Sequence, residues 1–319
     1  MSGTRRLTTL APLPTPAPLP PPRPLGDIET TLVSVAIGEP YETSLRRMNA
    51  TAAAAGFNRT QLWRRDDFLA DPLAQRHRGQ LDSMHQGHAA RKARHMVDRP
   101  FCGAFKAFAL LRALERSREG DYVLWADASK YHDARYRDVD VRDAIAALSG
   151  ARSPARPQRL AISAAYWASP WFRNRTQEPR RTTRSAYGVL HCHVGNCDQQ
   201  LFLPNFYRSS VNMRTLGAYP ELSGDDQAAI SRMSRRPHIM NANILLENTP
   251  FNRELMRAWV QMAVARPAHF CASVTQEQGV FSILVMGAHL PVVNPCPYLR
   301  ITGFNKCREP SATCMLAAC

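Results

Sequence analysis

Asp127 is the residue of this sequence whose position most clearly predicts chemistry. It follows Tyr122-Val-Leu-Trp-Ala126, an unbroken apolar run bounded upstream by Gly120. Such a run is typical of a central strand that is covered on both faces. Open α/β sheets bind ligands at the carboxyl ends of their strands, so an acid here is placed to hold a metal–phosphate or a polar substrate. The alternative is a solvated aspartate that opens the next loop.

The elements that must position this acid alternate along the chain between strands and helices. Apolar β-rich runs predict strands, and apolar residues spaced by three or four predict helices. We expect strands at 31–37, 61–63, 122–126, 159–165, 238–246 and 290–293, and helices at 41–55, 103–119, 249–264 and 276–286. The polar segment 71–99 is expected to be a long loop or a weak helix. This order predicts an α/β fold with a mostly parallel mixed sheet flanked by helices.

Two common nucleotide-binding devices are missing from the sequence. The turn after the first predicted strand, Ile37-Gly-Glu-Pro-Tyr41, has one glycine and no G-x-G-x-x-G pattern. A phosphate-binding P-loop motif is also absent from the sequence. A nucleotide ligand would therefore have to be held by strand-end carboxylates and a divalent ion.

The charge of the chain is strongly positive. Its 319 residues contain 41 basic and 26 acidic side chains, for a formal net charge of +15, and only four of the basic residues are lysines. Arginine suits phosphate groups, which favours an anionic ligand. A compositional bias toward arginine is the alternative, because the arginines are scattered along the sequence.

Four segments, taken in order, resemble nucleotide-sugar glycosyltransferases of the GT-A type. They are Gly103-Ala-Phe-Lys106-Ala-Phe-Ala-Leu-Leu111, then 120–129, then Asn241-Ala-Asn243-Ile-Leu-Leu-Glu-Asn-Thr-Pro-Phe251, and finally 276–284. The resemblance spans about residues 30–295. It implies a GT-A-like fold of the nucleotide-diphospho-sugar transferase type.

The resemblance places Asp127 at the first carboxylate of the family's D-x-D signature. In that family this region meets the donor's ribose or diphosphate, often through Mn²⁺ or Mg²⁺. Such an ion neutralises the charge that builds on the leaving phosphate. Ser129 occupies the second position, where the family has Asp or Gly, and a hydroxyl is a poorer metal ligand than a carboxylate. The metal expectation therefore rests on Asp127.

The same resemblance assigns roles to further side chains. Lys106 and Arg184 are expected beside the donor diphosphate. Asn241, Asn243 and Gln278 are expected to line the sugar or acceptor side, with Glu277 as the second candidate catalytic carboxylate after Asp127. Simpler interpretations stay open: a solvated helix lysine, asparagines that cap a turn, and an acid that favours a helix N-terminus.

Cysteine usage and the chain ends bear on organisation and compartment. We expect a disordered proline-rich tail over 1–26, one catalytic domain over 27–300 and a cysteine-containing tail over 301–319. Cysteines gathered in the last two dozen residues could pair as disulfides, and His191-Cys-His-Val-Gly-Asn-Cys197 favours a disulfide or free thiols over zinc. Three Asn-x-Thr sequons fit a secretory lumen. No leader or membrane-spanning run is recognisable, so the expected location is soluble, either cytoplasmic or lumenal if a targeting segment is missing.

The function expected from these residues is transfer of a sugar from a nucleotide-sugar donor to a glycan or other hydroxyl acceptor. The first alternative is a basic nucleic-acid-binding protein, which predicts charge concentrated on one face; nucleic acid is not the expected partner. The second alternative is a GT-A-like protein that has lost activity, with Ser129 as the sign of that loss.

Overall fold

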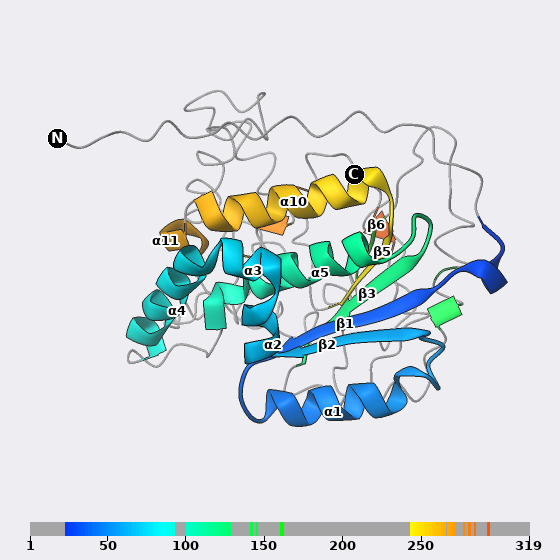
Figure 1. Cartoon of the computed structure of the whole chain (residues 1–319), viewed down its shortest axis with the longest axis horizontal. Helices are drawn as coiled ribbons and strands as arrows, with labels where there is room; N and C mark the ends of the chain where they lie inside the picture. The colour runs from blue at the N-terminus through cyan, green and yellow to red at the C-terminus, as the bar shows by residue number, and fades with distance from the viewer. Residues whose placement is uncertain are drawn as a thin grey trace, which may run out of the picture.

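The structure is a computed structural model that describes residues 23–92, 100–128, 141–142, 145, 160–162, 243–265, 267–271, 277, 280–281, 284 and 292–293. These residues form an α/β fold with one mixed sheet and helices on both of its faces (Figure 1). The strands are β1 (Thr30–Ala36), β2 (Arg59–Arg64), β3 (Tyr122–Ala126), β4 (Leu160–Ile162), β5 (Asn243–Glu247) and β6 (Val292–Val293). The helices are η1 (Leu25–Asp27), α1 (Tyr41–Ala52), α2 (Arg65–Ala70), α3 (Pro72–Arg76), α4 (Arg78–Lys92), η2 (Pro100–Gly103), α5 (Phe105–Arg116), α10 (Pro250–Ala265) and α11 (Pro267–Phe270).

The strand order of the sheet is β2-β1-β3-β5-β4-β6. Strand β1 pairs in parallel with β2 and with β3, and β4 pairs in parallel with β6. Strand β5 runs antiparallel to both of its neighbours, β3 and β4. The expectation of an α/β fold with a mixed sheet is therefore confirmed, and β5 is the strand that makes the sheet mixed.

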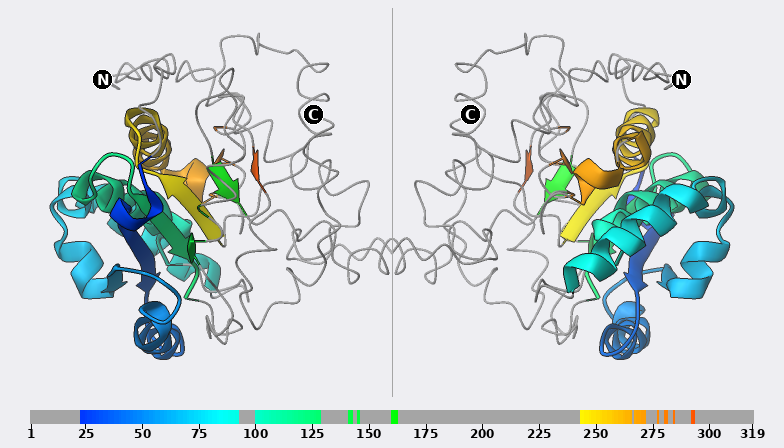
Figure 2. Two further views of the ribbon diagram at one scale, coloured as in Figure 1. Left: turned by 90° about the vertical axis from the view of Figure 1, so that its right-hand side faces the viewer. Right: turned by 90° about the vertical axis from the view of Figure 1, so that its left-hand side faces the viewer.

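Strand β3 lies between β1 and β5, and all five of its residues are buried. Its side chains alternate between two cores, as the two-residue period of a strand requires. Val123 and Trp125 pack with helices α2–α5 and α10 on one face of the sheet. Leu124 and Ala126 pack with α1 on the other face. Figure 2 shows these two layers from the side. The continuous apolar run thus arises because both faces are covered, as the sequence predicted.

Helix α5 begins directly after an unusual turn. Residues Phe101, Cys102 and Gly103 have φ angles of 52°, 54° and 81°, so three successive residues adopt the left-handed region. The chain then enters α5, whose apolar residues make it almost wholly buried between the sheet and α10. The predicted helix over 103–119 is confirmed, with a start two residues later because of this turn.

The polar segment after β2 is helical in the structure. Helices α3 and α4 occupy most of the segment 71–99, for which the sequence left a long loop and a weak helix as alternatives. Asp71 caps α3 by accepting a hydrogen bond from the backbone N–H of Leu73, and Pro72 stands at the first helical position. Leu81 and Met84 of α4 are buried in the core that covers one face of the sheet. Tertiary packing therefore stabilises a helix that its weak amphipathic pattern left open.

Asn248 connects the end of β5 to the end of α5. Its side chain is fully buried, and Nδ2 lies 2.9 to 3.0 Å from the backbone oxygens of Leu114, Ser117 and Arg118. These carbonyls belong to the last turn of α5 and to the residues after it, where helical partners are lacking. Asn248 is therefore a capping residue that the sequence did not single out.

Replacing Asn248 with alanine is expected to lower the free energy of unfolding by about 1–3 kcal/mol, because the backbone carbonyls of Leu114, Ser117 and Arg118 lose the hydrogen bonds that its amide donates. The matched control is Asn49→Ala, which removes an exposed amide whose oxygen accepts a hydrogen bond from Thr60. That control should stay within about 0.5 kcal/mol of the wild type. Urea unfolding of the two variants measures the difference, and equal midpoints would contradict the capping role.

None of the helices within the described part of the chain is long and apolar enough to cross a membrane.

Candidate functional site

The site is built at the edge of the sheet where β3 ends. Asp127 is the first residue after β3, and β1 ends at the same edge because it runs parallel to β3. Antiparallel β5 begins there, with Asn243 opposite Ala126 in the strand register. The backbone therefore brings Asp127 and Asn243 to one edge of the sheet, although they are 116 positions apart in the sequence.

Three of the side chains predicted from the sequence meet at this edge. The Nζ atom of Lys106 lies 3.0 Å from Oδ1 and 3.1 Å from Oδ2 of Asp127. The same Nζ atom lies 3.7 Å from Oε1 of Glu277. Their side chains are 6%, 26% and 0% exposed for Lys106, Asp127 and Glu277, respectively. We call these three residues the Lys106 cluster. It places one ammonium group between two carboxylates, of which only that of Asp127 has substantial access to solvent.

Trp125 makes a further contact with the Asp127 carboxylate. Its indole Nε1 donates a hydrogen bond of 2.8 Å to Oδ1 of Asp127. The indole is fully buried, and its ring centroid lies 6.0 Å from that of Phe105 at the start of α5. From the sequence alone, Trp125 is expected only to be a core residue of the strand. The contact has a signal in the sequence: Trp125 and Asp127 are two positions apart, and positions i and i+2 of an extended strand face the same side.

Gly103 allows Glu277 to approach the turn before α5. A Cβ atom built on Gly103 would lie 2.8 Å from Cγ and 2.9 Å from Cδ of Glu277, closer than real Cβ contacts allow. Gly103 also has a φ of 81°, which disfavours any residue with a side chain. Both its small size and its backbone angle are therefore required where Glu277 packs.

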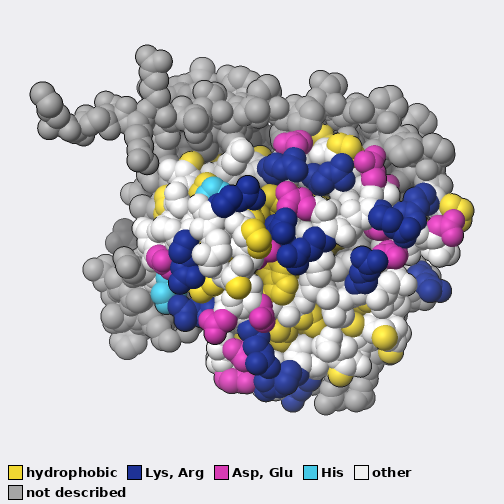
Figure 3. Space-filling model, in the orientation of Figure 1, with side chains coloured by type: hydrophobic (Ala, Val, Ile, Leu, Met, Phe, Trp, Pro, Cys, Tyr) yellow, Lys and Arg dark blue, Asp and Glu magenta, His cyan; other side chains and the backbone are white. Residues whose placement is uncertain are grey.

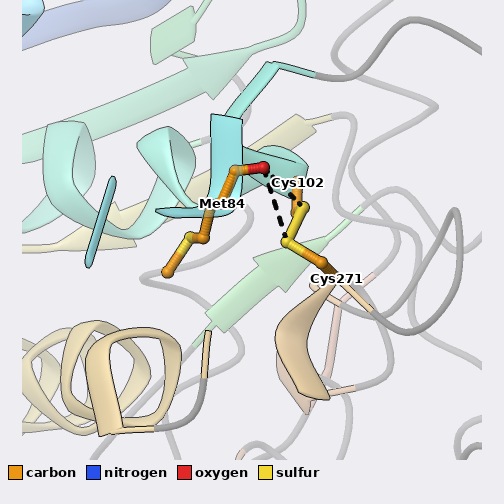
Figure 4. Close-up of a disulfide and its surroundings, with 3 residues drawn as sticks. All are labelled: Met84, Cys102 and Cys271. Atoms are coloured by element: carbon orange, nitrogen blue, oxygen red, sulfur yellow. Dashed lines mark hydrogen bonds between the residues drawn. A yellow bond between two sulfur atoms is a disulfide. The ribbon is translucent and has the colours of Figure 1, made fainter. Parts of the chain in front are cut away.

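A disulfide lies next to this glycine. Cys102 of η2 is bonded to Cys271, directly after α11, with Cα atoms 5.2 Å apart (Figure 4). Both sulfur atoms lie within 3.9 Å of the backbone oxygen of Met84 on α4. The two cysteines are 169 residues apart, so no local pattern in the sequence indicates this pairing.

Other predicted features of the cysteines lie outside the described residues. They are the disulfides near the C-terminus, the segment 191–197 and the tail 301–319.

The remaining predicted site residues are not placed by the structure. Ser129, Arg184, Asn241 and Gln278 lie outside the described residues, and Asn243 is described only as part of strand β5. Their proposed roles stay predictions. The three residues that the structure does bring together come from the start of α5, the end of β3 and the helical position 277.

The described residues do not form a preorganised metal site. Among them, no group of three or more His, Cys, Asp or Glu side chains is arranged to hold a metal ion. Both oxygens of Asp127 already contact Lys106, and one also accepts the Trp125 hydrogen bond. Mg²⁺ often uses one or two protein carboxylates and completes its shell with substrate phosphates and water. Asp127 is the only predicted metal ligand within the described part of the chain.

Positive charge on the described surface is mixed with negative charge. On the face in Figure 3, Lys and Arg side chains are interspersed with Asp and Glu. Arg112 and Arg116, for example, both bind the buried carboxylate of Asp71, with N–O distances of 3.0 Å. This face does not have the single concentrated basic surface that the nucleic-acid alternative predicts.

No protein-family model matches the chain, no curated protein is significantly similar to its sequence, and no solved structure is significantly similar to its fold.

Proposed function

We propose that this protein is a GT-A-like glycosyltransferase that moves a sugar from a nucleotide-sugar donor to an acceptor hydroxyl. The observation that carries the proposal is the Lys106 cluster at the carboxyl edge of β3. Lys106, Asp127 and Glu277 come from three motifs of the resemblance. The Nζ atom of Lys106 lies 3.0 Å from the carboxylate of Asp127 and 3.7 Å from that of Glu277. An α/β fold with a mixed sheet is also consistent with the family resemblance.

The proposed roles follow from exposure and charge. Asp127 is the most exposed member of the cluster, so it would meet the donor's ribose hydroxyls or an ion bound to its diphosphate. Lys106 carries positive charge beside the same edge, where it would offset the charge that develops on the leaving phosphate. Glu277 is buried behind Lys106 and would orient its ammonium group while lining the sugar side. A Mn²⁺ or Mg²⁺ ion, when bound at Asp127, would supply further charge neutralisation.

A donor panel tests the proposal directly. The protein is incubated with UDP- and GDP-sugars, with and without Mn²⁺, and donor binding, hydrolysis and transfer are measured. We expect one donor class to be used, and Asp127→Asn to lower turnover by about 10²–10³-fold because a preorganised charge is lost. The control is Asp82→Asn, which removes an exposed carboxylate on α4 that pairs with Arg78. That variant should retain wild-type turnover.

The possible outcomes separate the alternatives. Binding of no donor would overturn the proposed function, and steeply salt-dependent binding to nucleic acid would then support the basic binding protein. Donor binding without hydrolysis or transfer would indicate an inactive GT-A-like protein. Full turnover by Asp127→Asn would refute the site assignment while leaving the proposed activity intact.

A further inference from the structure

The Cys102–Cys271 disulfide joins the two chain segments that carry the buried part of the Lys106 cluster. Cys102 precedes Gly103 by one position and Lys106 by four, whereas Cys271 precedes Glu277 by six. The two segments meet again where the Glu277 side chain packs on Gly103 and where Glu277 approaches the Nζ atom of Lys106 at 3.7 Å. The disulfide and the contacts of Glu277 therefore connect the same two segments.

The turn held by this disulfide has an unfavourable backbone. Phe101 and Cys102 both have positive φ angles although neither is glycine. Side chains disfavour this region because Cβ crowds the following carbonyl oxygen. Phe101 is fully buried, with its ring centroid 5.8 Å from that of Phe68 and 5.2 Å from that of His85. Burial of Phe101 holds one side of the turn, and the bond from Cys102 to Cys271 holds the other.

We propose that this disulfide is a positioning element for the Lys106 cluster, which acts only while the bond is intact. A dithiol reductant would transfer two electrons and two protons to the Cys102–Cys271 bond, giving two thiols and the oxidised reductant. Without the bond, η2 and the segment after α11 are no longer tied, and the contact of Gly103 with Glu277 loosens. The protein is therefore built to act while the pair is oxidised, in a compartment that permits disulfides.

Hydrogen exchange of the oxidised and dithiothreitol-reduced full chain tests this inference without any ligand. Alkylation and mass spectrometry identify which cysteines have been reduced. On reduction of this pair, amide exchange in peptides covering 100–106 and 277 should rise by about tenfold or more, because these segments open locally. Peptides from β1 and β3 should not change. Unchanged exchange near the site, or equal loss of protection throughout the sheet, would overturn the proposal.

A double variant controls for the six other cysteines of the chain. Cys102→Ser with Cys271→Ser should show fast exchange near the site under both conditions, with no further response to dithiothreitol. A response as large as that of the wild type would assign the effect to another pair and overturn the proposal. Reduction of the wild type provides the same test if this variant does not fold.

The donor-binding consequence rests on the proposed function. If a donor is found, reduction of the wild type should weaken its binding by about tenfold or more, which corresponds to loss of one modest site contact. Donor affinity that is unchanged after verified reduction would contradict the positioning role. If no donor binds either form while exchange near the site still responds, the proposed function fails and the positioning role stands.

Discussion

Replacing Lys106 with methionine should lower the free energy of unfolding by about 3–5 kcal/mol, because it leaves buried negative charge without its partner. The Lys106 side chain is 6% exposed, and that of Glu277 is fully buried. Methionine is similar in length and apolar, so loss of packing contributes little to the expected change. Denaturant unfolding measures the effect, and donor binding should be lost in the same variant if the proposed function is correct.

Arg78→Met is the control for loss of a cation from an ion pair. Arg78 contacts Asp82 at 3.0 Å, but both side chains are more than 40% exposed. Such exposed pairs contribute only about 0–1 kcal/mol. A Lys106→Met variant as stable as Arg78→Met would contradict the view that the Lys106 cluster is an energetically coupled, buried unit.

A double-mutant cycle isolates the coupling between Lys106 and Glu277. Glu277→Gln removes the carboxylate charge with little change in shape. The combined variant should be more stable than the sum of the two single changes predicts, by about 0.5–3 kcal/mol, because neither charge is then left without the other. Strict additivity would show that the 3.7 Å approach of Lys106 Nζ to Glu277 Oε1 carries no net interaction.

Gly103→Ala should lower the free energy of unfolding by about 2–5 kcal/mol in total. The positive φ of 81° contributes about 1–2 kcal/mol for a residue with a Cβ atom. Contact of that Cβ with Glu277, at 2.8 Å before any adjustment, contributes about 1–3 kcal/mol more. The Glu277 side chain can relieve the contact only by moving, which would also displace it from Lys106.

Gly38→Ala separates the two contributions. Gly38 has a φ of 76°, close to that of Gly103, but a Cβ there would meet no atom within 4 Å. It should therefore show the backbone cost alone, about 1–2 kcal/mol. Calorimetric or urea unfolding of both variants gives the difference. Equal destabilisation would mean that Glu277 adjusts freely and that Gly103 is required only for its backbone angle.

Features with a local cause could be predicted from the sequence. The apolar run of β3 identified a strand covered on both faces, and the spacing in α5 identified its buried face. Asp127 was placed at the strand end because the apolar run stops there. Periodicity carries this information, since it is repeated within a few residues.

The cluster itself depended on motif resemblance and on the fold together. Lys106 and Asp127 lie 21 residues apart and Glu277 lies 150 residues further on, so spacing alone could not show that they meet. The resemblance grouped these residues by motif, and the tertiary structure placed them in contact.

Other features were decided only by the tertiary structure. The hydrogen bond from Trp125 to Asp127, the cap that Asn248 provides and the packing of Glu277 on Gly103 need the exact path of neighbouring segments. The bond between Cys102 and Cys271 closes a separation of 169 residues. Local sequence determines which residues form strands and helices, because those patterns repeat over short distances. Which distant side chains meet is settled by how the sheet orders its strands and how the helices pack on it, and no short-range pattern encodes that.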